Sequence, residues 1–371
     1  MAGDKQSQKA GDYSQQFQAN TVIVNQGIDE KRAREICEET FKTASRDFTA
    51  DAYACAEERV KKLENSLLPK IMEIENALNV FSDPSFQFLL KSAQKTAAAT
   101  EREADYDMLA ELLVCRVTKG QSRKNRAGLS RAVEIIDEID DDALCALTIA
   151  YASETFIPVC GYVNDGLQLL DNLFKKLFYL DLPTGSDWIE HLDILDAVRI
   201  NSINSFKKMN DLYCERLKGY AVAGIKIESE DYNKALKILS DANLDSSLLK
   251  QNINYPDYAL LPIINQNYIK DLTLVNDVNS NGTPPLFRSI NANEQAALKS
   301  VWDLYTSDPE VNRISKEAFI ANLDSYPALK KLRSWWDSIP VAFDITRVGA
   351  VLAHTNAKRC DNTLPELPLA T

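Results

Sequence analysis

Residues 29–81 read DEKRAREICEETFKTASRDFTADAYACAEERVKKLENSLLPKIMEIENALNVF, and this stretch decides the fold. Apolar or small side chains recur in it at steps of three or four residues, which places them on one face of a helix. Asp29 suits the N-cap of that helix, and Pro69 predicts either a kink or the start of a second, collinear helix. The stripe consists of Ala33, Cys37, Phe41, Ala44, Phe48, Ala52, Ala56, Val60, Leu63, Leu67, Ile71, Ile74, Leu78 and Phe81. It forms either ordinary core or, in its first half, a coiled coil with the same helix of another subunit.

The rest of the chain repeats the helical spacing. Helices are expected at about 84–99, 101–118, 126–138, 141–155, 159–180, 187–217, 229–240, 256–274, 292–306, 315–323 and 325–337, with a last one between Thr346 and Arg359. Residues 219–227 read as a strand or a loop, and 342–345 as one short strand. The predicted fold class is mostly α, a multi-helix body with a short N-terminal β-type repeat segment. The predicted parts are 1–28, a helical domain at 29–218, a second, mostly helical domain at 219–358, and a tail at 359–371.

The first 28 residues differ from all that follow. They contain two units that begin with Gly-Asp, a turn signal, and continue with polar residues, followed by a short β-branched run. A lone strand or hairpin of this kind has too little apolar surface to fold by itself. The segment is therefore either a disordered tail or an assembly module in which strands of several copies pair. The residues expected to carry assembly are Gly3, Asp4, Gly11, Asp12, Tyr13, Phe17, Val22, Ile23 and Val24.

Composition narrows the classes of function. The 371 residues include 54 acidic and 42 basic side chains, a net charge of −12, so a protein that coats nucleic acid over a broad surface is not expected. Two histidines and seven scattered cysteines without a CxxC pair predict no metal site, and we expect no cofactor. The start lacks the pattern of a signal peptide, and residues 143–164 read as a buried core helix rather than a membrane span. We therefore expect the protein to be cytoplasmic.

Six bases without an acid among them form the most conspicuous charge feature. They could hold the phosphate of a nucleotide or nucleic acid, lie on a solvated turn, or meet acids of another subunit. An acidic run, residues 134–142, follows directly and suits the third alternative. No Gly-rich phosphate-binding motif supports nucleotide binding. The candidate phosphate-binding residues are Arg116, Lys119, Arg123, Lys124, Arg126 and Arg131.

The sequence contains only weak signals for metal binding and for acid–base catalysis. The acids at 140–142 could bind a divalent cation, but they lack the spacing of a calcium loop and suit the start of a helix better. Glu190, His191 and Asp193 could form a carboxylate–histidine unit, although a surface or structural role for this histidine is more typical, as it is for His354. Catalytic residues are unknown at this stage.

Three segments together resemble a family of uncharacterised bacterial proteins known by locus labels. They are the opening GDKQSQ-x-A-GD, the run Phe81–Phe88 with Gln94 and Lys95 after it, and residues 107–116. The likeness covers residues 1 to about 160 well and the rest loosely. It implies a bacterial cytoplasmic protein with a polar β-type leader and a helical body, and it implies no reaction. The helix start at Thr346 and Gly349 is also similar to the ends of some proteins linked to phage defence.

The sequence favours a non-enzymatic homo-oligomer, a scaffold or sensor whose N-terminal segment joins subunits. The alternative is an effector, for example in phage defence, that binds nucleic acid or a nucleotide through residues 116–131. A second alternative is an enzyme of unrecognised type. The expected partner is a second copy of the chain, and no membrane span is expected.

Overall fold

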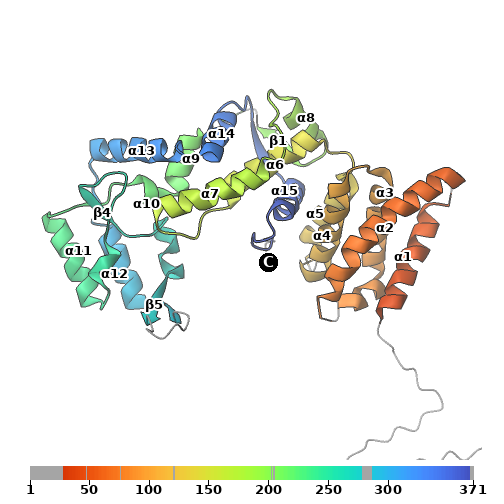
Figure 1. Cartoon of the computed structure of the whole chain (residues 1–371), viewed down its shortest axis with the longest axis horizontal. Coiled ribbons are helices and arrows are strands. Elements are labelled where there is room, and N and C mark those ends of the chain that lie inside the picture. The colour runs from red at the N-terminus through yellow and green to blue at the C-terminus, as the bar shows by residue number, and fades with distance from the viewer. Residues whose placement is uncertain are drawn as a thin grey trace, which may run out of the picture.

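A computed structural model describes residues 28–46, 48–75, 77–119, 122–201, 203, 205–277 and 286–367. The molecule is elongated and mostly helical, with a bundle formed by α1 to α5 at one end and the elements around α11 and α12 at the other (Figure 1). The predicted β-type repeat of residues 1–28 lies outside the described residues, apart from Ile28. The helical fold class is confirmed at this coarse level.

The N-terminal bundle contains five α-helices and one short 3₁₀ helix. These are α1 (Glu30–Ala44), α2 (Ala50–Met72), η1 (Ala77–Ser82), α3 (Pro84–Ala99), α4 (Glu103–Lys119) and α5 (Arg123–Ile135). Asp29 caps α1 by accepting a hydrogen bond from the Arg32 amide at 2.8 Å, as the sequence predicts. Helix α3 packs on α1, α2, α4 and α5 and so lies at the centre of the bundle.

The prediction of one helical stripe with a break at Pro69 is wrong in its geometry. The chain leaves the helix at Ser45, whose hydroxyl and amide both bond to the carbonyl of Phe41, and α1 and α2 diverge from that turn instead of being collinear (Figure 1). Pro69 lies inside α2, three residues before its end. Proline at this position removes the hydrogen bond that an amide would donate to the carbonyl four residues earlier, yet α2 continues to Met72. The apolar spacing of three or four residues continues through the turn at Ser45, so the spacing does not reveal the break between α1 and α2.

A central core joins the bundle to the rest of the molecule. Helix α6 (Asp141–Thr155) is buried along its whole middle, from Ala143 to Ser153, and it packs against α15 (Arg347–Cys360). A helix that is apolar all round has to be covered on every side. Around it lie α7 (Val163–Leu177), α8 (Asp187–Ile194), α9 (Met209–Arg216), α10 (Lys218–Ala221), α13 (Pro309–Leu323) and α14 (Pro327–Trp336). Strands β1 (Val198–Asn201) and β7 (Ala342–Ile345) pair antiparallel, with Val198 opposite Ile345.

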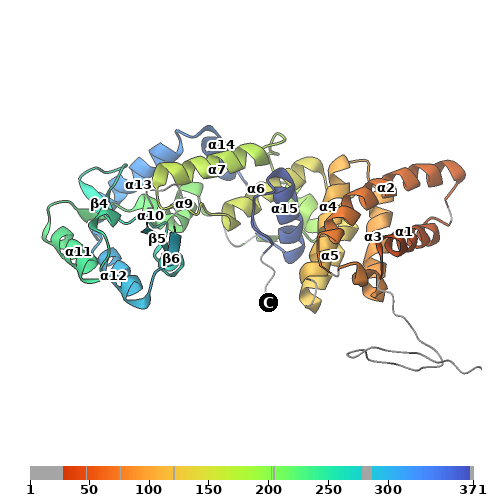
Figure 2. The same ribbon diagram turned by 60° about the horizontal axis from the view of Figure 1, so that its bottom comes forward.

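A second, smaller cluster of buried side chains lies at the far end (Figure 2). It is built on α11 (Glu230–Asp241) and α12 (Ala292–Trp302), with η2 (Ser246–Leu248) and η3 (Gln266–Asp271). A three-stranded sheet in the order β2 (Ile225–Lys226), β4 (Tyr258–Leu260), β3 (Lys250–Gln251) and a hairpin of β5 (Thr273–Asp277) with β6 (Leu286–Ser289) complete it. The predicted domain limits of 29–218 and 219–358 stay a prediction.

Two predicted helices are wrong. Residues 187–217 form α8, β1 and α9, and Asp196, two residues after the end of α8, adopts a left-handed φ of 61°. Residues 256–274 form β4, η3 and the start of β5. Both stretches are rich in short apolar runs, which do not distinguish a buried strand from a buried helix. In the described part of the chain, none of the helices has the length and apolar character that a bilayer span needs.

Candidate functional site

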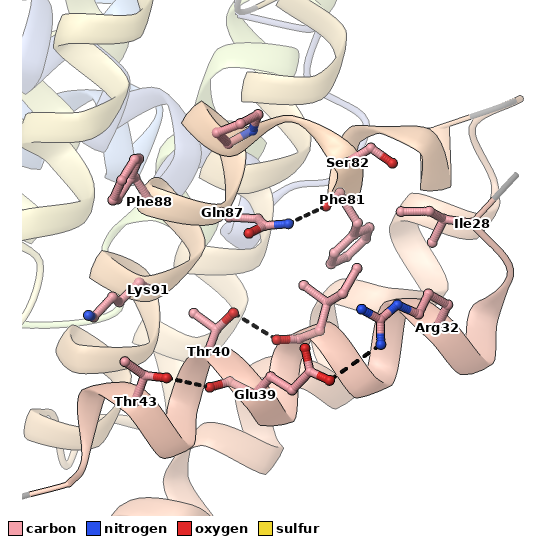
Figure 3. A pocket seen from close by; sticks show the side chains of 12 residues that line it. Ile28, Arg32, Glu39, Thr40, Thr43, Phe81, Ser82, Gln87, Phe88 and Lys91 are labelled. Carbon is pink, nitrogen blue, oxygen red and sulfur yellow. Dashed lines mark hydrogen bonds and ion pairs between the residues drawn. The ribbon is translucent and has the colours of Figure 1, made fainter.

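An open groove runs between α1 on one side and η1 with the start of α3 on the other (Figure 3). We call it the α1 groove; its volume is about 700 Å³. Its lining combines apolar side chains with uncharged hydrogen-bonding ones and a few charges: Ile28, Arg32, Ile36, Glu39, Thr40, Thr43, Phe81, Ser82, Pro84, Gln87, Phe88 and Lys91. The groove starts at Ile28, the first residue that the structure describes.

The floor of the groove is apolar and fixed by the bundle core. Phe81 is fully buried and packs edge-on against Phe86 of α3, with ring centroids 5.2 Å apart. Asp83 starts α3 by accepting a hydrogen bond from the Ser85 amide at 2.9 Å, and Pro84 occupies the first helical position. The Gln87 side-chain amide donates to the Phe81 carbonyl at 2.7 Å, and this hydrogen bond joins α3 to η1 within the wall opposite α1.

The α1 wall is polar, and much of its polarity is satisfied within the helix. The Thr40 hydroxyl donates to the Ile36 carbonyl at 2.7 Å, and the Thr43 hydroxyl donates to the Glu39 carbonyl at 2.9 Å. Arg32 forms ion pairs with Glu39 at 3.3 Å and with Glu35 at 3.0 Å. The hydrogen bonds from Arg32 to Glu35 and Glu39, and the negative charges of these two residues, raise the pKa of the Arg32 guanidinium, which stays charged. Ion pairs this exposed contribute little stability, so the wall can be remodelled at low cost.

The outer edge of the groove carries an aromatic ring in water. Phe88 is 76% exposed, although Phe86, Leu89 and Leu90 of the same helix are buried. Lys91 lies one turn further along α3, opposite Thr43 (Figure 3). An uncovered aromatic side chain beside a groove is typical of a surface that binds another chain. The described lining combines apolar side chains with hydrogen-bonding groups, a composition that suits the binding of another molecule.

Sequence reasoning did not single out Thr40, Thr43, Gln87 or Lys91. The signal that could have found the groove is Phe88, because it falls off the buried stripe of α3. The nine predicted assembly residues, by contrast, all lie outside the described residues. Ile28 is the described residue nearest to them in sequence, and it packs against the core.

The six bases of the predicted phosphate site differ in the partners that they contact. Arg116 donates to Ser85 at 2.8 Å and pairs with Asp83 at 3.3 Å. The Lys119 ammonium donates to the Leu367 carbonyl at 2.8 Å. The remaining four lie on α5: Arg131 pairs with Glu134 at 3.5 Å and Asp196 at 3.8 Å, whereas Arg123, Lys124 and Arg126 form no ion pair with the residues that the structure describes.

The candidate carboxylate–histidine unit is not assembled. The His191 ring accepts a hydrogen bond from the Asp140 amide at 3.2 Å, while the Asp193 carboxylate accepts one from the Ile200 amide at 3.2 Å. Asp140 is the N-cap of α6, so the acidic run begins a helix as expected. Among the described residues, no group of three His, Cys, Asp or Glu side chains could hold a metal ion.

His354 is buried between α6 and α15. Its Nδ1 lies 3.2 Å from the Tyr151 hydroxyl, and its ring is 2% exposed. Burial lowers the pKa of His354 to about 4, so the imidazole is neutral at physiological pH. The ring packs against the aromatic rings of Tyr151 and Phe156 and is shielded from solvent, so we assign His354 to the core.

Comparisons with known proteins give a family but no activity. The model of an uncharacterised family, described only as "-like", matches residues 27–367. No curated protein and no solved structure matches the chain. The matched region covers all the described residues, from Ile28 at the start of the α1 groove to Leu367. The chain therefore belongs to this uncharacterised family.

Proposed function

We propose that the protein is a non-enzymatic homo-oligomeric scaffold or sensor of the bacterial cytoplasm, whose residues 1–28 join subunits. The observation that supports this proposal is the position of the α1 groove. It opens at Ile28, where the repeat segment meets the helical body, and its outer edge exposes Phe88. A binding surface and a segment unable to fold alone thus adjoin each other.

The test is the mass of the particle in solution. Deletion of residues 1–28 should reduce the mass measured by light scattering from that of an oligomer to that of a single chain. The matched control is deletion of residues 368–371, which removes only the opposite end of the chain and should leave the mass of the oligomer intact. A full-length protein that is monomeric, or a deletion variant that stays oligomeric, would contradict the proposal.

A second function is favoured by one specific observation. Arg123 and Lys124 are exposed on the first turn of α5, and neither forms an ion pair with described residues. Together with Arg126 they give this helix start three bases without an acid. An effector that binds nucleic acid or a nucleotide would contact phosphate there.

Charge reversal tests this second function. Changing Arg123, Lys124 and Arg126 to Glu should abolish binding of labelled RNA, DNA or nucleotide at low salt, measured by fluorescence anisotropy. The control reverses Lys226, Lys234 and Lys237, which are exposed lysines at the far end of the molecule. Absence of binding by the unmodified protein at low salt removes the second function.

A further inference from the structure

We infer that the α1 groove is the receptor for residues 20–27 of a second copy of this chain. The inference rests on the proposed homo-oligomer and specifies which surface joins the subunits. It names the occupant as the segment NTVIVNQG, which precedes the first described residue. The contacts expected in the groove are those of the β-branched side chains Val22, Ile23 and Val24.

The point where the chain enters the helical body supports the inference. Ile28 lines the groove, and Asp29 after it has extended backbone angles, with φ −89° and ψ 173°. The groove then follows α1 from Ile28 to Thr43 (Figure 3). The residue that directly follows the donor segment in the sequence is therefore part of the receptor groove. Two copies can exchange these segments reciprocally about a two-fold axis, as an isologous contact requires.

The chemistry of the groove matches that segment. Residues 13–27 contain no charged side chain and are rich in Gln and Asn. The groove exposes the apolar side chain of Phe88 at its edge, and the buried side chains of Ile36 and Phe81 lie beneath it. Gln87 uses its amide nitrogen on the Phe81 carbonyl, and its oxygen accepts no hydrogen bond from the described residues, so it can accept one from an incoming amide.

The charges in the groove do not oppose an uncharged occupant. Arg32 and Glu39 pair with each other, so this part of the wall needs no counter-charge from a ligand. Thr40, Thr43 and Ser82 add hydroxyl groups, which suit a segment of amide side chains and backbone. Lys91 of the lining forms no ion pair with the described residues, so a strongly basic peptide would be opposed there, whereas this neutral segment is not.

The lengths also agree, and the direction of the chain favours a second copy. The fifteen steps along α1 from Ile28 to Thr43 span about 22 Å at 1.5 Å per residue. Eight residues in an extended conformation reach about 26 Å. To lie in the groove of its own subunit, the segment would have to reverse direction just before Ile28. A segment that arrives from another subunit needs no such reversal.

The main experiment uses the full-length chain. Phe88→Asp places a charge at the edge of the groove and should reduce the mass measured by light scattering to 41.6 kDa, that of one chain. Ile23→Asp should give the same result from the donor side. The matched control is Val159→Asp, a change of the same kind at a side chain that is 97% exposed elsewhere, and it should leave the oligomer intact. Circular dichroism checks that all three variants fold.

A peptide experiment separates the inference from the proposal on which it rests. A labelled peptide of residues 13–28 should bind the Ile23→Asp protein in anisotropy titrations, and binding should weaken at least tenfold when Phe88→Asp is added. If Ile23→Asp dissociates the oligomer but Phe88→Asp does not, the α1 groove is not the receptor, while assembly through the segment stands. If the unmodified chain is monomeric and the peptide still binds, the groove does not hold the segment of a second copy. The proposed homo-oligomer is then wrong as well.

Discussion

Gly161 and Gly219 bring the loop after α6 and the start of α10 into backbone contact with residues 262–264. A methyl group on Gly219 would lie 1.7 Å from the Ile263 carbonyl oxygen, and one on Gly161 would lie 1.6 Å from that of Pro262. The Gly219 amide also donates to the Ile264 carbonyl at 2.6 Å. These contacts need glycine because no side chain fits between the two backbones.

Gly219→Ala should lower the free energy of unfolding by about 3 kcal/mol, because backbone must move to admit the methyl group. Thermal or urea unfolding measures the loss. The control is Gly185→Asn, at a position with φ 79° and no atom within 4 Å of an added carbon. Asn tolerates this conformation, so the control should change stability little. An unchanged Gly219→Ala protein would show that the contact is not tight.

His354 predicts a dependence of stability on pH. Its folded pKa of about 4 lies below the ordinary value of 6.5, because burial disfavours the charged ring. Below pH 6.5 the unfolded chain binds a proton at this position that the folded chain does not bind. Stability from this group is therefore complete above pH 6.5 and falls as the pH drops toward 4, by up to about 3 kcal/mol.

Urea unfolding between pH 7 and pH 4 measures this dependence. The difference between the wild type and His354→Gln should grow smaller as the pH falls, because only the wild type loses the contribution of the buried ring. His191→Gln is the matched control, since His191 of α8 is partly exposed and accepts a hydrogen bond from the Asp140 amide at the start of α6. Parallel pH curves for wild type and His354→Gln would contradict the buried, neutral state of His354.

At the scale of elements, Arg102 joins the start of α4 to the turn between α5 and α6. Its guanidinium donates to the Ile139 carbonyl at 3.0 Å and the Ile136 carbonyl at 2.8 Å, and to the Asp105 carboxylate at 2.6 Å. Asp105 is fully buried, and burial raises its pKa. A second ion pair with Asp141 fixes the start of α6 to the same group.

Arg102→Ala should cost about 3–5 kcal/mol, since it leaves a buried carboxylate without its partner. Adding Asp105→Asn should recover part of that loss, because the unpaired charge is then removed. Chemical denaturation of the two variants gives both values. The matched control, Arg313→Ala, breaks exposed ion pairs with Glu310 and Glu317 and should cost far less. If Arg102→Ala and Arg313→Ala lower the free energy of unfolding equally, Arg102 does not hold α4 to the turn between α5 and α6.

The helices that the sequence predicts best are those with strong local signals. Pro84 after Asp83 set the start of α3, and the acids at 140–142 set that of α6. Asn291 and Glu294 form a capping box, in which each side chain accepts a hydrogen bond from the backbone of the other residue. The adjacent Trp335 and Trp336 are both buried in the larger cluster, and their indole groups donate to the Pro183 and Lys207 carbonyls, respectively.

Elements whose form depends on distant partners could not be predicted in this way. Strand β1 exists because Val198 and its neighbours pair with β7, almost 150 residues later in the chain. The α1 groove likewise needs η1 and α3 beside α1, and only the exposed position of Phe88 carried a local hint of it. The basic stretch was visible, but the acids and carbonyls that engage half of it lie elsewhere in the sequence.

For the molecule as a whole, the two buried clusters predict unequal local stability. The larger one holds α6 and α15 at its centre, whereas the smaller one draws on α11, α12 and short strands. Less buried apolar surface gives less resistance to local opening. Residues 225–302 should therefore exchange their amide hydrogens faster than residues 141–155 do.

Hydrogen exchange followed by mass spectrometry compares the two regions in one sample. The internal control is α15, which packs against α6 and should exchange as slowly as α6 does. Equal protection throughout the chain would instead indicate a single cooperative unit.

Helix α6 also has a consequence for how the protein is made. It is apolar on every side, and one of the helices that cover it, α15, is completed only at Cys360. The ribosome must add roughly two hundred residues between α6 and the end of α15, at about 5–20 residues per second. During that time part of the apolar surface of α6 is exposed in the nascent chain. Translation pauses or early stop codons before α15 would leave this surface exposed, and such products should depend on chaperones or be degraded.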